Sequence, residues 1–212
     1  MPAARPRPGR LPAAARRAQL VEIGRRVFAE RGYEAASVEE IADRAKVSKP
    51  IVYEHFGGKE GLYAVIVDRE VEHIVASIES AVSSGTPRER LDGAALAFMT
   101  YVQERPDGFA VLLRDAPPSK RGGEMPALMY DLADRVGGIF SEIFRTAGYD
   151  AKAAPIYAHA LVGMVAFVGQ WWTEAPKPPA AEAVASHIAA LAWMGLRHLP
   201  RKPAPLRTKR PG

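Results

Sequence analysis

The sequence predicts an all-α protein with a small N-terminal domain of three helices and a larger helical domain after it. Apolar residues recur every three or four positions along most of the chain, which is the spacing of one helical face. No segment has the pattern of a strand. Gly and Pro residues separate the helical segments, and a chain of 212 residues can form one or two domains with proper cores.

Composition excludes several classes of protein. Hydrophobic residues make up 48% of the chain and charged residues 25%, which is ordinary for a soluble globular protein. The absence of Cys excludes disulfides and thiolate metal sites, and it fits a reducing compartment. The chain has no run of 18 apolar residues and no apolar core of a signal peptide near its start. We therefore expect a cytoplasmic protein that neither spans a membrane nor is secreted.

The charge is distributed unevenly. The net charge is +5, yet five Arg residues occur before any acid, up to Arg17, and six cationic residues occur from Arg197 onward without an acid. Subtracting these eleven charges leaves −6 for the part between them. We expect a basic arm at residues 1–11 and a basic Pro-rich tail at 200–212. Such segments attract phosphates, although they can also be merely solvated and disordered.

The first helix is expected from Pro12 to Arg31, with Gly32 as its C-terminal stop. One face of this helix carries the apolar residues Leu20, Ile23, Val27 and Phe28. Two short helices that follow cannot bury their own apolar faces, so we expect this first helix to support them.

The second helix begins after Ser37. Glu40 follows three residues later, which is the pattern of a capping box. One helical face then consists of Val38, Ile41, Ala42 and Ala45. The pattern stops at Lys46, where a turn of this type often carries Gly, so a non-Gly residue at positive φ would cost roughly 1 kcal/mol.

The third helix starts at Ser48, whose hydroxyl could cap it, and Pro50 lies in its first turn, where a missing N–H costs little. Gly57 and Gly58 end it. A helix, a short turn and a second helix make a helix-turn-helix, whose second helix can lie in the major groove of DNA. Core positions within it are expected to be Val52 and Phe56.

The segment from Ser37 to Tyr63, SVEEIADRAKVSKPIVYEHFGGKEGLY, resembles the TetR family of transcription regulators. With the preceding helix, the resemblance covers roughly residues 12–65. It implies a DNA-binding domain at 12–58, completed by the start of a connector helix to about residue 70. It also implies a regulatory and dimerisation domain at 59–199, and a protein that is not an enzyme.

The candidate DNA contacts lie in and beside the third helix. Lys49 can donate to guanine, while Pro50 and Ile51 are apolar and can touch a thymine methyl. The family resemblance implies phosphate contacts by Tyr53, His55 and Lys59; alternatively, the first two are ordinary surface residues with a buried ring. The full set of expected DNA contacts is Ser37, Ser48, Lys49, Pro50, Ile51, Tyr53, His55 and Lys59.

The remaining helices are expected at 59–82, 88–104, 107–116, 127–146, 155–173 and 180–199. Gly137 and Gly138 interrupt the fourth of these and indicate either close packing or a bend. The helix at 155–173 is apolar on nearly all sides, so we expect it to be buried on several of them.

The resemblance implies a small-molecule site inside the second domain. Pockets of this kind are mostly apolar with a few polar groups, although each of these residues could equally belong to an ordinary core. The candidate lining residues are Phe98, Tyr101, Phe109, Leu112, Met125, Met129, His159, Met164, Phe167, Gln170 and Trp171.

The last two helices carry more apolar surface than one small subunit can hide, which favours an interface between two copies. We expect a homodimer built on a four-helix bundle, unless these residues only close the core of the subunit. The expected seam residues are Leu161, Val165, Val168, Ile188, Leu191 and Leu196.

We therefore expect a regulator, most simply a repressor, that binds a palindromic operator as a homodimer and is released by an unknown small molecule. Alternatives are an activator, a ligand-independent regulator, or a module that binds a membrane surface or a protein through its basic tails. An enzyme is disfavoured because the common phosphate-binding, metalloprotease and nucleophile motifs are absent. The five His residues show no metal-ligand spacing, and we expect no cofactor.

Overall fold

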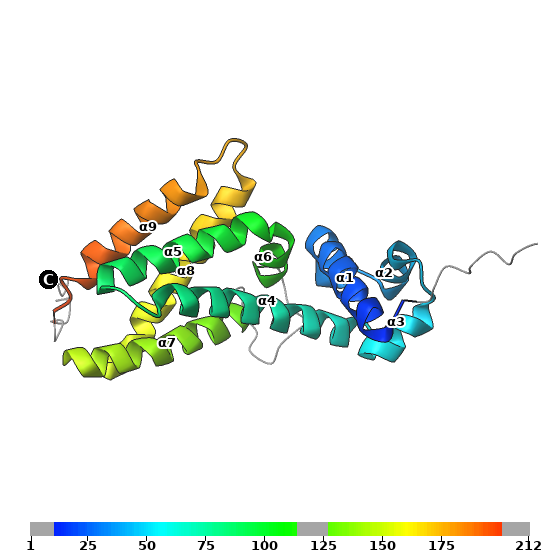
Figure 1. Cartoon of the computed structure of the whole chain (residues 1–212), viewed down its shortest axis with the longest axis horizontal. Helices are drawn as coiled ribbons and strands as arrows, with labels where there is room; N and C mark the ends of the chain where they lie inside the picture. The colour runs from blue at the N-terminus through cyan, green and yellow to red at the C-terminus, as the bar shows by residue number, and fades with distance from the viewer. Residues whose placement is uncertain (1–10, 114–126, 201–212) are drawn as a thin grey trace, which may run out of the picture.

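The computed structural model describes residues 11–113 and 127–200, apart from the side chains of residues 127–129, 131 and 132. All regular structure in these ranges is helical, which confirms the all-α expectation (Figure 1). The expected basic arm and tail, and the end of the helix expected at 107–116, lie mostly outside the described residues.

The N-terminal head contains three helices, and the connector α4 leads from it into the body (Figure 1). Their bounds are α1 (Ala13–Ala35), α2 (Val38–Ala45), α3 (Lys49–Phe56) and α4 (Lys59–Val82). The body consists of α5 (Pro87–Glu104), α6 (Pro106–Leu113), α7 (Ala127–Ala147), the 3-10 turn η1 (Ala151–Ala153), α8 (Ala154–Glu174) and α9 (Ala181–Leu196). In the body, α7 packs on α8, and α5 packs on both α4 and α9.

Two hydrophobic cores hold the chain together. The head core includes Leu20, Val27, Phe28, Ile41, Val52, Leu62 and Ile66. The body core includes Phe98, Met99, Val102, Phe109, Leu112 and Ala189. Val111 of α6 belongs to the head core, while its neighbours Phe109 and Leu112 belong to the body core. The short helix α6 therefore joins the two cores.

Local signals act at the positions that the sequence predicts, although α1 is longer than expected. Gly32 and Gly57 adopt left-handed φ values of 76° and 73°. Gly57 ends α3 as expected, whereas Gly32 is a kink inside α1, which continues to Ala35 instead of ending at Arg31. Lys46 also has a left-handed backbone (φ 54°, ψ 46°), so the turn between α2 and α3 holds a non-Gly residue in the strained region, as expected. The bounds of α2 and α4 agree with the prediction to within a residue.

The caps differ from expectation. The Ser37 Oγ accepts the backbone N–H of Glu40 at 3.1 Å, but the Glu40 carboxylate accepts from Arg44 at 2.7 Å. Half of the expected capping box is thus replaced by an ion pair within α2. Ser48 sits at the N-cap of α3 without a capping hydrogen bond from its side chain. A complete capping box forms instead at the start of α5, where Thr86 and Glu89 bond each other's backbone N–H.

Helix α8 is much less buried in the single chain than the sequence predicts. Its fully buried residues are Ala154, Ala158, Val162 and Gly169, and side chains such as Met164 and Val165 pack only partly buried against the body core. Ile156 and Phe167 are 69% and 75% exposed. Helix α7 runs unbroken through its two glycines. The two glycines therefore do not mark a bend. A methyl group at Gly137 would lie 3.7 Å from the Cβ of Ala158, an ordinary contact distance, so the packing of α7 on α8 does not require glycine there.

Candidate nucleic-acid interface

The outer face of α3 is built by burying its other face. Val52 is fully buried in the head core, and this fixes the rotation of the helix. Ser48, Lys49 and Pro50 are then exposed at the N-terminal end, and Tyr53 is 47% exposed one turn later. These four residues form an open surface at the end of the helix from which base edges are usually read.

Lys49 is held over this surface by two neighbours. Its ammonium donates to the carboxylate of Glu39 on α2 and lies 5.8 Å from the centre of the Tyr53 ring. The hydrogen bond to Glu39 raises the pKa of Lys49 and lowers the pKa of Glu39, so both remain charged near neutral pH. Binding of DNA at Lys49 has to compete with this exposed ion pair.

Arg17 clamps the far end of α3, which sequence reasoning missed. Its guanidinium donates to the carbonyl of His55 at 2.9 Å and stacks over the Phe56 ring at 4.4 Å. The sequence shows Arg17 only as one of the five Arg residues that precede the first acid. Because the contact joins positions 38 residues apart, no local pattern in the sequence could have indicated it.

Lys59 makes contacts within the head in addition to the phosphate contact that the family resemblance implies. Its ammonium donates to the carbonyls of Tyr33, Glu34 and Ala36 at 2.9, 3.2 and 3.1 Å. A Lys has three N–H donors, and all three are engaged here. In this structure Lys59 therefore closes the end of α1, and its expected phosphate contact would require these bonds to break.

The other expected contacts are less open. Ile51 packs against the head core, and His55 is half-buried beside Phe56. The hydroxyl oxygen of Ser37 is already used as a cap, although its O–H can still donate. The structure thus brings Ser48, Lys49, Pro50 and Tyr53 together on one surface and turns Lys59 away from it.

The candidate ligand residues separate into two groups. Three of them, Phe98, Phe109 and Leu112, line a small apolar cavity of about 50 Å³ among α4 to α8. The other lining residues are Ile74, Ile78, Val136, Val162, Val165 and Ala166. Val165 was expected at the dimer seam, but it lines this cavity. The cavity wall is wholly apolar.

The second group lies elsewhere. Phe167, Gln170 and Trp171 are exposed on the outer face of α8, because the opposite face of the helix packs into the body. Tyr101 is buried, but its hydroxyl donates to Glu70 at 3.2 Å. His159 is half-buried on α8 with its ring 5.9 Å from that of Tyr130, and Met164 packs at the edge of the body core. Met125 lies outside the described residues, and nothing is described of the Met129 side chain.

The candidate seam residues also divide. Leu191 is 66% exposed on α9, as an interface residue of a free subunit would be, whereas Ile188 is 6% exposed and belongs to the body core. Ile188 was therefore placed wrongly, because its face of α9 packs against α5. The exposed apolar residues of α8 and α9 are Ile156, Phe167, Trp171, Leu191 and Met194. Leu161, Val168 and Leu196 are half-buried beside them.

An exposed cationic end of a buttressed helix, mounted on a larger helical body, defines a helix-turn-helix DNA-binding regulator. Residues 20–66 match the family described as "Bacterial regulatory proteins, tetR family". The activator FasR of Mycolicibacterium smegmatis is 32% identical over 197 residues, which cover 92% of this chain and 89% of that protein. The chain belongs to the TetR family of DNA-binding transcriptional regulators, and it is not an enzyme.

Two further relatives show the range of the family. The repressor KstR2 of Mycobacterium tuberculosis is 34% identical over 89 residues, which cover 42% of this chain and 44% of KstR2. A TetR-like transcriptional regulator from Rhodococcus sp. RHA1 has a solved structure with a TM-score of 0.70 and 28% identity. That likeness covers 90% of this chain and all of the other. Activators and repressors thus both occur among the relatives.

Proposed function

We propose that the protein binds a palindromic operator as a homodimer, represses transcription from it, and is released when a small apolar molecule enters the body. The observation that carries this proposal is the exposed surface of α3, where Lys49 and Tyr53 lie at the reading end of a rigidly held helix. Two such helices, spaced by about one turn of DNA (roughly 34–36 Å), would match two half-sites. A regulator of this kind would act in the cytoplasm.

The dimer is supported by the outer faces of α8 and α9. Side chains of Phe167, Trp171 and Leu191 are more than half exposed and lie on the last two helices, which is unusual for a monomer surface. The segment Ala151–Glu174 is also long and apolar enough to cross a membrane. The packing of its Ala158 and Val162 into the body supports a protein partner for the exposed face instead.

A ligand response is supported by the apolar cavity in the body. Its volume of about 50 Å³ is far below the roughly 300–1,000 Å³ of a typical ligand site. A ligand could therefore enter only if the helices around the cavity moved apart. Such a ligand would prefer the expanded arrangement and shift the population toward it. Because α4 lines the cavity and begins in the head, the movement would reach the DNA-binding surface.

Genomic footprinting of the bound protein, read together with transcript levels in a deletion strain, tests this function. We expect footprints over inverted repeats and raised transcription of the neighbouring genes after deletion. Activation is the second candidate, because the relative that matches 92% of the chain is named an activator. Lowered transcription after deletion would establish that the protein activates the neighbouring genes. Absence of any inverted-repeat footprint would contradict the proposal in both forms.

A further inference from the structure

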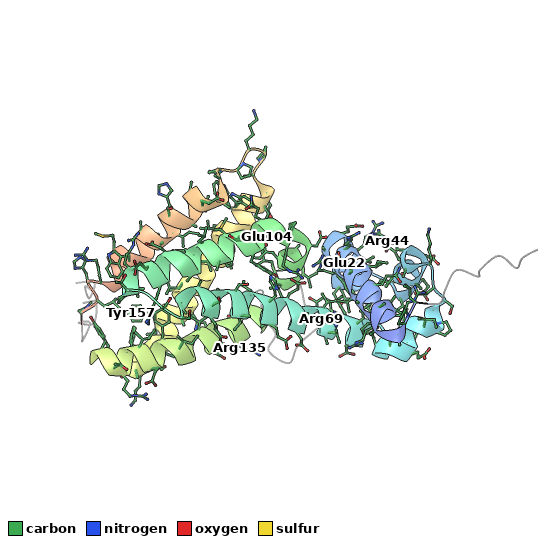
Figure 2. All side chains as sticks on the ribbon, in the orientation of Figure 1. Glu22, Arg44, Arg69, Glu104, Arg135 and Tyr157 are labelled. Atoms are coloured by element: carbon green, nitrogen blue, oxygen red, sulfur yellow. The ribbon has the colours of Figure 1, made fainter. Side chains whose placement is uncertain are left out.

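A buried carboxylate lies at the joint between the head and the body. Among the residues that the structure describes, Glu70 is the only charged residue that is buried, at 2% exposure. It belongs to the connector α4 and lies close to Arg25 of α1 and Gly108 of α6. Helices α1 and α6 pack against each other beside α4 (Figure 1). Glu22 on the α1 side of this joint and Glu104 on the α5 side are labelled in Figure 2.

The Glu70 carboxylate is anchored to the body by two parallel bonds. Its Oε1 accepts from the Arg105 Nη2 at 2.6 Å and its Oε2 accepts from the Arg105 Nε at 2.9 Å. This fork geometry is the strongest way for a guanidinium to bind a carboxylate. The Tyr101 hydroxyl donates to Oε2 at 3.2 Å, so the two anchors come from α5 and from the residue that caps its C-terminal end.

The same carboxylate reaches the head through Arg25 of α1. The Arg25 Nη1 donates to the Glu70 Oε1 at 3.4 Å, the longest bond of the cluster, and the Arg25 Nη2 donates to Glu22 at 2.8 Å. The Nε of Arg25 is buried without a hydrogen-bond partner. The contact on the head side is therefore weaker than the contact on the body side.

Helix α6 closes over the cluster. A methyl group at Gly108 would overlap the Glu70 Oε2 and lie 3.1 Å from the Tyr101 hydroxyl, so only glycine lets the backbone of α6 approach this closely. Phe109, next in α6, lines the apolar cavity of the body. If a change in cavity volume moved α6, it would therefore also move the Gly108 backbone that packs against the Glu70 carboxylate.

We propose that Glu70 is a positioning residue that sets the orientation of the DNA-binding head. Arg105 fixes the Glu70 carboxylate to the body, and this carboxylate in turn binds Arg25 of the head. The bidentate pair remains intact when the body rearranges, and the weaker Arg25 bond is the one that breaks. The head then loses its fixed direction. The inference concerns the same DNA-binding surface as the proposed function and deepens it, but the contacts that carry it do not involve DNA.

The absence of Cys from the chain allows a direct test, because two introduced Cys residues can be spin-labelled without background. Asp43→Cys on α2 and Ser84→Cys beyond α4 place labels on exposed residues of the head and body. Double electron–electron resonance, with labelled chains diluted in unlabelled ones, then measures the distance between head and body within one chain. We expect one narrow distribution, which Arg25→Met broadens or shifts.

Arg26→Met is the matched control. Arg26 is the next residue of α1 and pairs with the same Glu22, but it is exposed and forms no bond to Glu70. We expect its distance distribution to equal that of the wild type. Glu70→Gln should resemble Arg25→Met if it folds. If Glu70→Gln does not fold, Arg25→Met still tests the proposal, because Arg25 lies on the partly exposed side of the cluster. A folded Arg25→Met protein with the wild-type distribution would overturn the proposal.

Operator binding separates this inference from the proposed function. We expect Arg25→Met to weaken binding to a correctly spaced inverted repeat by about tenfold while leaving affinity for an isolated half-site unchanged. Equal affinities of Arg25→Met and wild type for the full repeat would count against the positioning role. If the wild type bound no duplex while Arg25→Met still broadened the distance distribution, the proposed function would fail and the positioning role would stand.

Discussion

Lys46 shows at the scale of one residue how the turn of the helix-turn-helix stores strain. It is the only non-Gly residue with positive φ among those described, and its side chain is exposed. The backbone N–H of Lys46 bonds back into α2, so the left-handed geometry is maintained by the helix end. The sequence predicted this strain because glycine is the residue that such turns favour.

Replacing Lys46 by Gly should stabilise the protein. Removing the Cβ relieves roughly 1 kcal/mol of strain, and the greater freedom of Gly in the unfolded chain offsets part of this. We expect a net rise of about 0.5 kcal/mol in the free energy of unfolding, measured by urea denaturation. Lys46→Ala, which keeps the strained Cβ, should give no such gain; an equal gain from Ala would assign the effect to the lost charge.

Lys49 and Tyr53 should differ in their effect on DNA binding. We expect Lys49→Ala to cost about 1–3 kcal/mol and to relax the base preference of the half-site that it reads. Tyr53→Phe keeps the ring beside Gly58 but loses the hydroxyl, and should weaken binding to all duplexes alike. Fluorescence anisotropy with operator and scrambled duplexes at several salt concentrations measures both. If Tyr53→Phe bound DNA with unchanged affinity, the Tyr53 hydroxyl would not be a phosphate contact.

The charge of Glu70 should make stability depend on pH in a specific range. Burial pushes its pKa upward, but the hydrogen bond and charge of Arg105, with the charge of Arg25, outweigh burial and leave the pKa below its ordinary value. Its contribution to stability is therefore complete above the unfolded pKa of about 4.3 and is lost as pH falls through the lower folded value.

Urea denaturation of the wild type and Glu70→Gln from pH 7 to pH 3 measures this contribution. We expect a constant difference in the free energy of unfolding down to about pH 5, and a difference that shrinks below about pH 4.3. A stability advantage of the wild type that grows as pH falls from neutral would instead mean that the folded pKa is raised.

At the scale of an element, α4 connects the head to the body and also forms polar contacts that bind it to each of them. Its first residue, Lys59, bonds three carbonyls at the end of α1, and its middle carries Glu70. Tyr63, one turn into α4, packs its ring edge-on against Phe28 at 5.0 Å between centroids. The helix therefore holds the head by its first turns and the body by its later ones.

Removing the Lys59 ammonium should destabilise the head more than it affects contact with phosphates. Lys59→Met keeps the apolar stem and leaves three carbonyls without their donor, which should cost about 1–3 kcal/mol of unfolding free energy. Thermal unfolding measures this cost, and the salt dependence of DNA binding measures lost phosphate contacts. A stable Lys59→Met protein with a reduced salt slope would restore the role that the family resemblance implies.

At the scale of the whole molecule, the outer faces of α8 and α9 remain to be covered. We expect the double variant Phe167→Glu and Leu191→Glu to be monomeric in sedimentation analysis, whereas the wild type should sediment as a dimer. Ile143→Glu is the matched control, because Ile143 is 51% exposed on α7, outside the proposed seam. A wild-type protein that sediments as a monomer would contradict the proposed assembly.

Most helix bounds and the exposed face of α3 could be predicted because their signals are local. Ser37, Gly32 and Gly57 act through their own backbone and that of residues within one helical turn, and helical spacing assigns Val52 to the core and Tyr53 to the surface. A linear pattern carries this information without any knowledge of the fold. The helix-turn-helix and its outward face therefore follow from the sequence.

The partners of the long polar side chains followed only from the packing of the helices. Arg17 reaches His55, Lys59 reaches back to Tyr33, and the Tyr101 hydroxyl reaches Glu70, across separations of 38, 26 and 31 residues. Helical spacing can identify the face of a helix on which a residue lies, but not which helix covers that face. The structural use of Lys59, the burial of Ile188 and the carboxylate at the joint depend on that second choice, so they became apparent only in three dimensions.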